Sequence, residues 1–308
     1  MQLKKILFGI VIVLLLNGCT NEDKVSTQAI LDFDNAQKAY LNKNYQNAIN
    51  LFQKSCDAGN TGACVKLADI YNGDVATKHD YIKALKLYQK TCSSKHHEGC
   101  AGLGDMYMFA AGCAFLGEDK ECTDLGNKIG SDVNVASNKS AELYKISCDG
   151  GDAYGCAKLA ESYENGAGVE KNENKALALR EKACDMNFSG ACTVLGMEYS
   201  GDYGDKPANP TKMIHYYNKS CELNNFTACN ELGVMYKEGK VIQHDYVKAL
   251  QYYTKSCDGG FAGSCLNIGV MYSNGEGLNR DLSKAKSYFD KACSMGLNQG
   301  CDYSSELN

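Results

Sequence analysis

The sequence has no tryptophan and only two prolines, against 31 glycines, 20 tyrosines and 17 cysteines in 308 residues. This composition is not that of one or two ordinary globular domains. Positive charge is also scarce, since 32 Lys and Arg face 37 Asp and Glu and no basic patch stands out. The charge argues against nucleic acid as a partner. Seventeen cysteines are too many for a reduced cytosolic protein, and they indicate an oxidising compartment.

Residues 1–18 have the layout of a secretory signal peptide. Two lysines precede an apolar run at residues 6–16, which is too short to span a bilayer, and polar residues follow Cys19. The end of this segment, Leu-Asn-Gly-Cys, resembles a bacterial lipoprotein signal, which implies a lipidated Cys19 and a tether over residues 19–26. The alternative is an ordinary cleaved signal. Without Cys19 sixteen cysteines remain, an even number suited to complete pairing.

Fourteen of these cysteines form pairs that share one spacing, with the second cysteine eight positions after the first. The pairs are Cys56/Cys64, Cys92/Cys100, Cys148/Cys156, Cys184/Cys192, Cys221/Cys229, Cys257/Cys265 and Cys293/Cys301. The first cysteines lie 36 or 37 residues apart, except for one interval of 56. The additional residues fall at about 110–132 and contain Cys113 and Cys122. The sequence is therefore a repeat with one insertion.

Each repeat has the same pattern around its cysteines. Twelve positions before the first cysteine, six of the seven pairs have an Asn or Asp, which predicts a helix N-cap: Asn44, Asp80, Asn172, Asn209, Asp245 and Asp281. Four positions before it, six have an aromatic residue: Phe52, Tyr88, Tyr144, Tyr217, Tyr253 and Phe289. In the first six pairs, the residue four positions after the second cysteine is Ala or Gly, and the residue seven positions after it is Tyr. Glycine inside a helix is costly, so it predicts that a neighbouring helix crosses closely there.

These patterns predict two antiparallel helices per repeat. The expected helix pairs are 27–42 with 45–57, 61–72 with 80–94, 97–109 with 137–149, 153–164 with 172–186, 189–200 with 209–223, 226–237 with 245–258, and 262–273 with 281–294; a last helix at 298–306 caps the array. One hairpin cannot bury both its apolar stripes, so the units must stack. The predicted fold is an all-α, α/α solenoid of about seven hairpins over residues 27–308, with a right-handed superhelix.

The segments Asp-Tyr-Val-Lys-Ala-Leu (245–250) and Leu-Gly-Val-Met-Tyr (232–236) resemble Sel1-like repeats, relatives of the tetratricopeptide repeat. With a Cys-x7-Cys in every unit, the chain from about 27 to 304 resembles the Helicobacter cysteine-rich protein family. The insertion departs from that pattern. Some members of the family are described as penicillin-binding or weakly β-lactam-hydrolysing proteins. The resemblance therefore implies that the sequence should be searched for the serine motifs of such enzymes.

The cysteines themselves favour disulfides over metal binding or redox chemistry. Metal clusters have shorter gaps or mixed Cys and His, and the Cys-x-x-Cys of redox proteins is absent. We therefore predict eight bridges, one within each spaced pair and Cys113 with Cys122, and no metal or cofactor. His96-His97-Glu98 is the one histidine cluster, and it is expected in a turn as a solvated loop rather than as a ligand set.

Serine β-lactamases need Ser-x-x-Lys, Ser-Asp-Asn and Lys-Thr-Gly. The nearest matches are Ser283-Lys284-Ala285-Lys286, Ser131-Asp132-Val133 and Lys90-Thr91. Ser283 falls in the first turn of a regular repeat helix, which argues against a dedicated serine site. Arg180 replaces the repeat's aromatic residue, either as a local repacking or as an exposed anchor for a carboxylate ligand. The insertion is either a functional loop or a tolerated loop closed by its disulfide. The repeated tyrosines are expected to pack between units.

The sequence thus predicts an exported, membrane-anchored scaffold that binds a protein, peptide or cell-wall ligand on the concave face of the solenoid. We expect the protein to be a bacterial outer-membrane lipoprotein that is periplasmic or surface-exposed. Its lipid anchor is the only contact with the membrane that we expect. One alternative is a slow penicillin-binding protein or β-lactamase, by resemblance. A second alternative is a secreted factor that acts on host cells. No catalytic residue is assigned.

Overall fold

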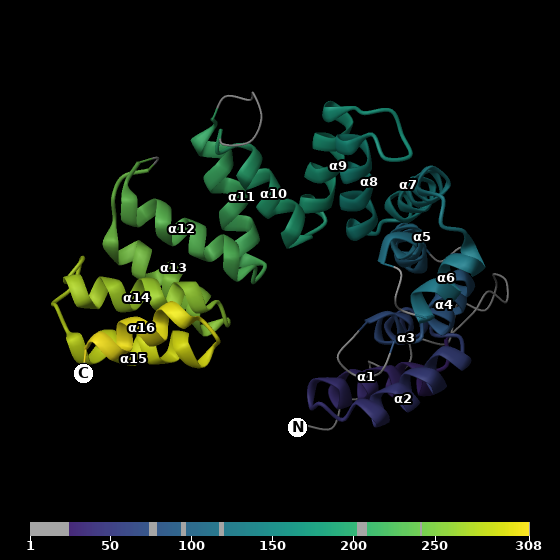
Figure 1. The fold of residues 1–308 in the computed structure, drawn as a ribbon, viewed down its shortest axis with the longest axis horizontal. Helices are drawn as coiled ribbons and strands as arrows, with labels where there is room; N and C mark the ends of the chain where they lie inside the picture. Colours follow the sequence, from purple (N-terminus) through teal and green to yellow (C-terminus); the bar gives the residue numbers. More distant parts are fainter. Residues whose placement is uncertain are drawn as a thin grey trace, which may run out of the picture. The chain divides into compact units, whose positions relative to one another are not determined.

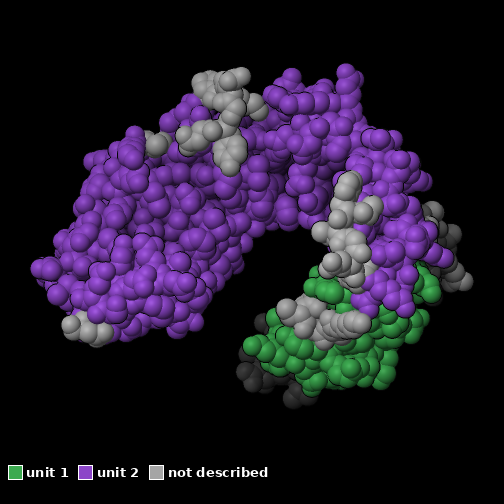
Figure 2. Space-filling model, viewed as in Figure 1, with its two compact units in different colours: residues 1–96 green, residues 97–308 purple. Residues whose placement is uncertain are grey.

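The computed structural model describes residues 25–73, 79–93, 97–116, 120–201, 208–240 and 242–307. The predicted signal segment, the lipidated Cys19 and most of the tether lie outside the described residues. The chain divides into two compact units, residues 1–96 and 97–308, coloured separately in Figure 2. Each unit is described by itself.

Unit 1 consists of two helical hairpins. Its helices are α1 (Thr27–Leu41), α2 (Tyr45–Asp57), α3 (Thr61–Gly73) and α4 (Tyr81–Ser93). α1 packs on α2, α3 packs on α4, and α2 packs on α3 to join the two hairpins. Its core includes Phe52 and Leu67 together with Cys56 and Cys64.

Unit 2 repeats the same arrangement over a longer stretch (Figure 1). Its helices are α5 (Glu98–Leu116), α6 (Lys120–Ile129), α7 (Val133–Asp149), α8 (Ala153–Asn165), α9 (Glu173–Asp185), α10 (Ser189–Glu198), α11 (Pro210–Glu222), α12 (Phe226–Glu238), α13 (Tyr246–Asp258), α14 (Ala262–Asn274), α15 (Leu282–Ser294) and α16 (Asn298–Glu306). The hairpins are α5/α7, α8/α9, α10/α11, α12/α13 and α14/α15, and α16 packs on α15.

The described residues form sixteen helices and no strand, which confirms the all-α class and the α/α repeat fold. The right-handed superhelix stays a prediction. We call the first helix of each hairpin an A helix and the second a B helix. The A helices are α1, α3, α5, α8, α10, α12, α14 and α16, and the B helices are α2, α4, α7, α9, α11, α13 and α15. The helix α6 belongs to the insertion.

Five of the six predicted N-cap residues make the expected side-chain bond. The side chains of Asp80, Asn172, Asn209, Asp245 and Asp281 each accept a hydrogen bond from the backbone amide three residues later. Asn44 is also the N-cap residue of α2, but its side chain makes no cap bond, and its φ and ψ of −86° and 66° are not extended. Each of the five caps also donates its own N–H to the carbonyl of the preceding repeat tyrosine, as Asp281 does to Tyr272 at 2.9 Å. This bond closes the hairpin.

The repeated glycine of the A helix faces an aromatic ring of the B helix, which confirms the predicted close crossing. A Cβ at Gly269 would lie 2.4 Å from the Phe289 ring, and one at Gly233 would lie 2.6 Å from the Tyr253 ring. Only glycine allows the ring to lie flat against the helix backbone at this distance. The aromatic rings are buried, with 3% of Phe289 and 1% of Tyr253 exposed.

The insertion was predicted as a loop over about 110–132, and this is wrong, as are the bounds 97–109 and 137–149. The helix α5 continues to Leu116, because the residues after 109 include the helix formers Ala110 and Ala111. The helix α6 follows, and α7 starts at Val133, four residues early, since Asp132 caps its first amides. The insertion is therefore largely helical.

Disulfides join the ends of six B helices to the start of the A helix that follows each. The bridges with Cα–Cα distances of 4.4–4.8 Å are Cys56–Cys64, Cys148–Cys156, Cys184–Cys192, Cys221–Cys229, Cys257–Cys265 and Cys293–Cys301. Cys113–Cys122 joins α5 to α6, and Cys92 and Cys100 are also disulfide-bonded. Each small loop stabilises the fold by roughly 2–3 kcal/mol if chain entropy dominates. So many disulfides indicate an oxidising compartment outside the cytoplasm.

Among the described residues, no helix combines the length and the apolar character needed to cross a bilayer.

Candidate functional site: clefts between successive A helices

Three pockets of the described chain occupy the same position in the repeat. Each lies between two successive A helices, and its floor is the aromatic residue four positions before the B-helix cysteine. These floor residues are Phe52, Tyr144 and Phe289. The repeat places them alike because the aromatic side chain spans the hairpin and reaches the gap beside the next A helix. We call these pockets the α1/α3, α5/α8 and α14/α16 clefts.

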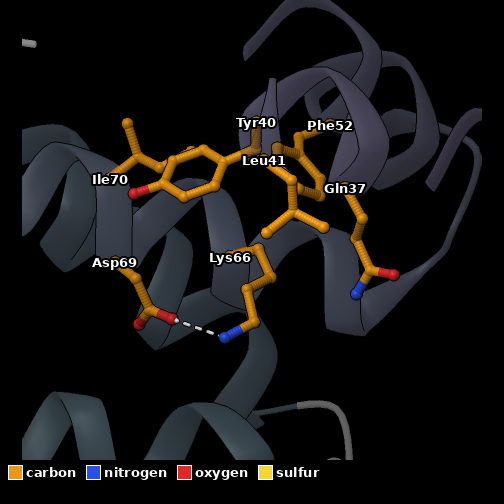
Figure 3. A pocket seen from close by; sticks show the side chains of 7 residues that line it. All are labelled: Gln37, Tyr40, Leu41, Phe52, Lys66, Asp69 and Ile70. Carbon is orange, nitrogen blue, oxygen red and sulfur yellow. Dashed lines mark hydrogen bonds and ion pairs between the residues drawn. The ribbon is translucent and has the colours of Figure 1, made fainter. Parts of the chain in front are cut away.

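The α1/α3 cleft, in unit 1, has a volume of about 360 Å³ and a largely apolar lining (Figure 3). Tyr40, Leu41 and Phe52 contribute apolar surface, and Leu41 is 79% exposed. Lys66 lies on the α3 side and forms an ion pair of 3.4 Å with Asp69. The cleft therefore offers an apolar surface bordered by one positive and one negative group.

The α5/α8 cleft, in unit 2, is lined mainly by polar residues, although apolar atoms still form a large part of its surface. Its volume is about 260 Å³, and its lining is formed by Asp105, Met108, Ser137, Ser140, Tyr144, Lys158, Glu161, Ser162, Asn165 and Ala167. Lys158 and Glu161 form an ion pair of 2.9 Å within α8. Ser140 donates to the Gly104 carbonyl at 2.7 Å, and Ser162 donates to the Lys158 carbonyl at 3.1 Å, so these hydroxyls stay fixed.

The carboxylate of Asp105 lies at the base of this cleft and accepts two phenol hydrogen bonds. The Tyr144 hydroxyl donates to Oδ1 and the Tyr154 hydroxyl to Oδ2, each at 2.7 Å. Burial raises the pKa of Asp105, although the two phenols and Lys158 oppose that shift. The pKa values of Tyr144 and Tyr154 are raised, chiefly by burial and then by the Asp105 charge. The phenols therefore stay neutral donors to a desolvated carboxylate.

The α14/α16 cleft has a volume of about 250 Å³ and closes the C-terminal end of the array. Its lining comes from Val270, Ser273 and Asn274 of α14, from Phe289, and from Tyr303, Glu306 and Leu307. The Tyr303 ring packs edge-on against Phe289 with 5.3 Å between centroids. The terminal helix thus supplies its own wall although it lacks the repeat's Leu and Tyr.

Ion pairs occupy the corresponding place between α8 and α10. Arg180 has the floor position, is 4% exposed, and forms ion pairs with Glu164 at 2.7 Å and with Glu198. In the α5/α8 cleft the equivalent positions are Met108, Tyr144 and Ser162. The hypothesis of an exposed anchor for a carboxylate ligand does not fit a buried guanidinium that two carboxylates already neutralise. The alternative, a local repacking, does.

A second repeated feature is a stack of lysine and tyrosine next to each cap. In three hairpins two tyrosine rings stack with centroids 5.6–5.8 Å apart: Tyr199/Tyr216, Tyr236/Tyr252 and Tyr272/Tyr288. A lysine amine lies 4.7–5.2 Å from the first ring of each pair: Lys212, Lys248 and Lys284. Burial, the Glu181 charge and Tyr199 raise the pKa of Tyr216 to about 12. Each stack joins the A and B helices of one hairpin, whereas the sequence predicts that these tyrosines pack between units.

The serine motifs do not form a catalytic set. Ser283 is exposed in the first turn of α15, and Lys286 donates to Ser304 at 2.8 Å rather than facing Ser283. Asp132 caps α7, and Thr91 donates to the Leu87 carbonyl within its own helix. Lys286, Asp132 and Thr91 thus have structural contacts of their own, away from Ser283.

The histidine cluster is only partly described, since His96 lies outside the described residues. His97 packs against Gly150, where a Cβ would come within 1.8 Å of its ring. No group of three or more His, Cys, Asp or Glu side chains within the described parts of the chain could hold a metal ion. His97 therefore serves packing at the end of α7.

Sequence reasoning missed Asp105 and Arg180's two partners. Asp105 occupies the fifth position after the second cysteine, where Asp69, Glu161 and Glu306 stand in three other repeats and Met197, Val234 and Val270 in the remaining three. These acidic residues at a position that is apolar in the other repeats were a usable signal. The contact between Asp105 and Tyr154 had no such signal in the sequence, because it joins residues 49 positions apart.

Comparison with family models agrees with the hairpin geometry. The Sel1 repeat model matches residues 38–60, 61–96, 153–188, 189–225, 227–261 and 262–297, which is most of the chain. The chain belongs to the Sel1 repeat family. Each internal Sel1 match contains one A helix and the B helix that follows it. The hairpin of α5 and α7 falls outside the matched segments, and it is the hairpin with the insertion.

Solved structures show the same Sel1 fold. A Sel1 repeat protein from Oxalobacter formigenes is 22% identical over 85% of this chain and 99% of its own, with a TM-score of 0.63. An immunity protein from Pseudomonas aeruginosa is 18% identical over 80% and 88%, with a TM-score of 0.54. Cysteine rich protein B of Helicobacter pylori is 33% identical over 44% of this chain and 96% of its own, with a TM-score of 0.35. Curated protein sequences give no match.

Proposed function

We propose that this Sel1 repeat protein is an extracytoplasmic scaffold that binds an extended segment of another protein along its A helices. The observation that supports this is the recurrence of one cleft, between successive A helices and above the aromatic floor residue. Repeat arrays bind in this way because each unit offers an equivalent site to successive parts of one ligand. The clefts have volumes of about 250–360 Å³, near or below the lower end of the range of small-molecule sites, which suits single side chains.

The clefts differ in chemistry, and this difference supports selective binding. The α1/α3 cleft is mostly apolar, the α5/α8 cleft is lined mainly by polar and charged residues, and ion pairs occupy the α8/α10 position. A surface that served only to keep repeats together would have no reason to vary while the aromatic floor and the glycine contact stay nearly constant. We infer that the variable walls select the partner.

Site-specific photo-crosslinking tests this function. A benzophenone amino acid is placed at Asn165, an exposed residue that lines the α5/α8 cleft, and in a second variant at Leu41 of the α1/α3 cleft. The control position is Lys139, which is exposed on α7 and does not line a cleft. We expect both cleft variants to crosslink one and the same envelope protein, through one short segment that mass spectrometry locates. Equal crosslinking from Lys139, or none from either cleft, would contradict the proposal.

The membrane anchor is part of the same proposal. All sixteen cysteines of the described residues are disulfide-bonded, so Cys19 has no cysteine of this chain left to pair with. This supports a lipid on Cys19 after removal of residues 1–18. The substitution Cys19→Ser should release the protein from the membrane fraction and remove the acyl mass from its mature N-terminus. Membrane association of the variant equal to that of the natural protein would exclude the anchor.

A further inference from the structure

The α5/α8 cleft differs from the other two by a partly buried carboxylate held by two phenols. Asp105 accepts one phenol hydrogen bond on each oxygen, and both donors are neutral. A carboxylate oxygen has further acceptor capacity after one such bond. The two phenols orient the carboxylate without cancelling its charge. Within the cleft, the remaining lone pairs of Asp105 are available to a further donor.

The charges of the cleft do not balance. Lys158 is the one cation of its lining, and its amine is ion-paired with Glu161 at 2.9 Å and lies 5.6 Å from the Tyr154 ring centroid. Asp105 and Glu161 therefore outnumber Lys158 by one negative charge. A partly buried charge without a full counter-charge has lost part of its hydration, and a cation that enters the cleft recovers part of that cost.

The rest of the lining suits an alkylammonium or guanidinium group. Ser137, Ser162 and Asn165 add oxygen acceptors, and Met108 and the Tyr144 ring add an apolar wall for a methylene chain. The volume of about 260 Å³ is below the range of drug-sized ligand sites, so the cleft admits a side chain and excludes a large cofactor.

We propose that the α5/α8 cleft is a subsite for a lysine or arginine side chain of the bound protein segment, with Asp105 as its counter-ion. This inference rests on the proposed function and names the chemistry of one position of the partner. The partner segment accordingly places a basic residue there. Glu161 on the rim adds a second carboxylate near the entering cation. Because Lys158 already supplies one positive charge, the site holds only one further cation.

The test is an NMR titration of the isotope-labelled mature protein with acetyl-Gly-Gly-Lys-Gly-Gly-amide. Its control is the same peptide with norleucine, which has the chain length but no charge. We expect the lysine peptide to shift the amide signals of Ser140, Ser162 and Asn165, and the norleucine peptide to bind at least about tenfold more weakly, since a hydrogen bond to a charged group has that worth. Equal binding of the two peptides would overturn the inference.

Two variants locate the effect. Asp105→Asn keeps an acceptor for a tyrosine hydroxyl and removes the charge, and it should weaken lysine-peptide binding by about tenfold. If Asp105→Asn does not fold, Glu161→Gln on the exposed rim should still weaken binding at least twofold. Glu142→Gln, an exposed residue of α7 outside the cleft, is the matched control and should leave binding unchanged. Full binding by both cleft variants would contradict the assignment.

A third titration uses n-butylammonium, which has the same cation without a peptide backbone. We expect n-butylammonium to bind more weakly than the lysine peptide. Equal binding would mean that the cleft binds free amines, and it would overturn the proposal that its ligand is a side chain of a protein segment. The crosslinking experiment keeps the two proposals apart. Crosslinking to one partner without any lysine preference would sink this inference and leave the proposed function standing.

Discussion

The guanidinium of Arg180 lies against the carboxylate of Glu198, which is 13% exposed, and at the position of Arg180 the other repeats have an aromatic residue. At the position of Glu198 the other repeats include Met106, Met235 and Met271. The arginine and the glutamate have therefore replaced two apolar residues together. Between α8 and α10, an ion pair therefore takes the place that an aromatic ring has in the other repeats.

The first prediction follows from this pair. Arg180→Ala leaves Glu198 without its counter-ion and should lower the free energy of unfolding by about 3–5 kcal/mol, as breaking a buried ion pair does. The double variant Arg180→Tyr with Glu198→Met restores the usual repeat residues. It should be as stable as the natural protein or more stable by about 1–4 kcal/mol. Urea denaturation followed by circular dichroism measures both, and a stable Arg180→Ala would show that the pair is not structural.

The glycine of the A helix gives a second prediction. Gly269→Ala places a methyl group 2.4 Å from the Phe289 ring, and overpacking of this kind costs about 1–3 kcal/mol. Gly112→Ala is the matched control, because a Cβ there has no neighbour within 4 Å. The control should gain roughly 0.5–1 kcal/mol from helix propensity. Thermal unfolding of both variants separates the two effects, and a gain in both would refute the close crossing.

The pH dependence of stability tests the environment of Asp105. Burial raises the pKa of Asp105 in the folded state, so the folded protein binds that proton more tightly than the unfolded chain does. Its contribution to stability is therefore present at low pH and is lost as pH rises through the folded pKa. The variant Asp105→Asn does not titrate. Its free energy of unfolding, relative to the natural protein, should increase between pH 4 and pH 7.

Urea denaturation at several pH values provides that comparison, with Glu142→Gln as the control for an exposed carboxylate. A difference between Asp105→Asn and the natural protein that stays constant, or becomes smaller as pH rises, would mean that Asp105 is not desolvated.

Acylation by a fluorescent penicillin tests the enzymatic alternative. Because Ser283 is exposed in a regular helix and Lys286 contacts Ser304, we expect no covalent adduct at this serine. Mass spectrometry of the intact protein after incubation is the measurement. A stoichiometric adduct that disappears in Ser283→Ala would reverse this conclusion.

Most of the fold could be predicted because several independent sequence features indicate the same helices and recur from repeat to repeat. The Asp281 cap, the Phe289 ring and Gly269 each indicate the same hairpin, and each has counterparts at fixed spacing in other repeats. Asn44 misled because its position matched while the α1–α2 connection is a tight turn, with Lys43 at a φ of 60°. A tight turn leaves the cap side chain in a different direction.

The clefts could be predicted only in part. Their aromatic floor follows from the repeat, but their character depends on which side chains from two A helices meet. Arg180 could be recognised in the sequence because it departs from the repeat pattern. Its partners Glu164 and Glu198 could not, because they lie on other helices and no fixed spacing in the sequence marks such contacts. The insertion misled for another reason. Its excess length suggested a loop, while local helix propensity extended α5 and formed α6.

The central claim is that covalent closure at the repeat boundaries holds the A helices, and thereby their clefts, in register outside the cytoplasm. Peptide mapping of the mature protein, isolated under non-reducing conditions with free thiols alkylated, tests it most directly. The account predicts only bridges between neighbouring cysteines of the repeat, the Cys113–Cys122 bridge in the insertion, and no alkylated thiol among these sixteen residues. Predominantly alkylated cysteines, or bridges that join distant repeats, would contradict it.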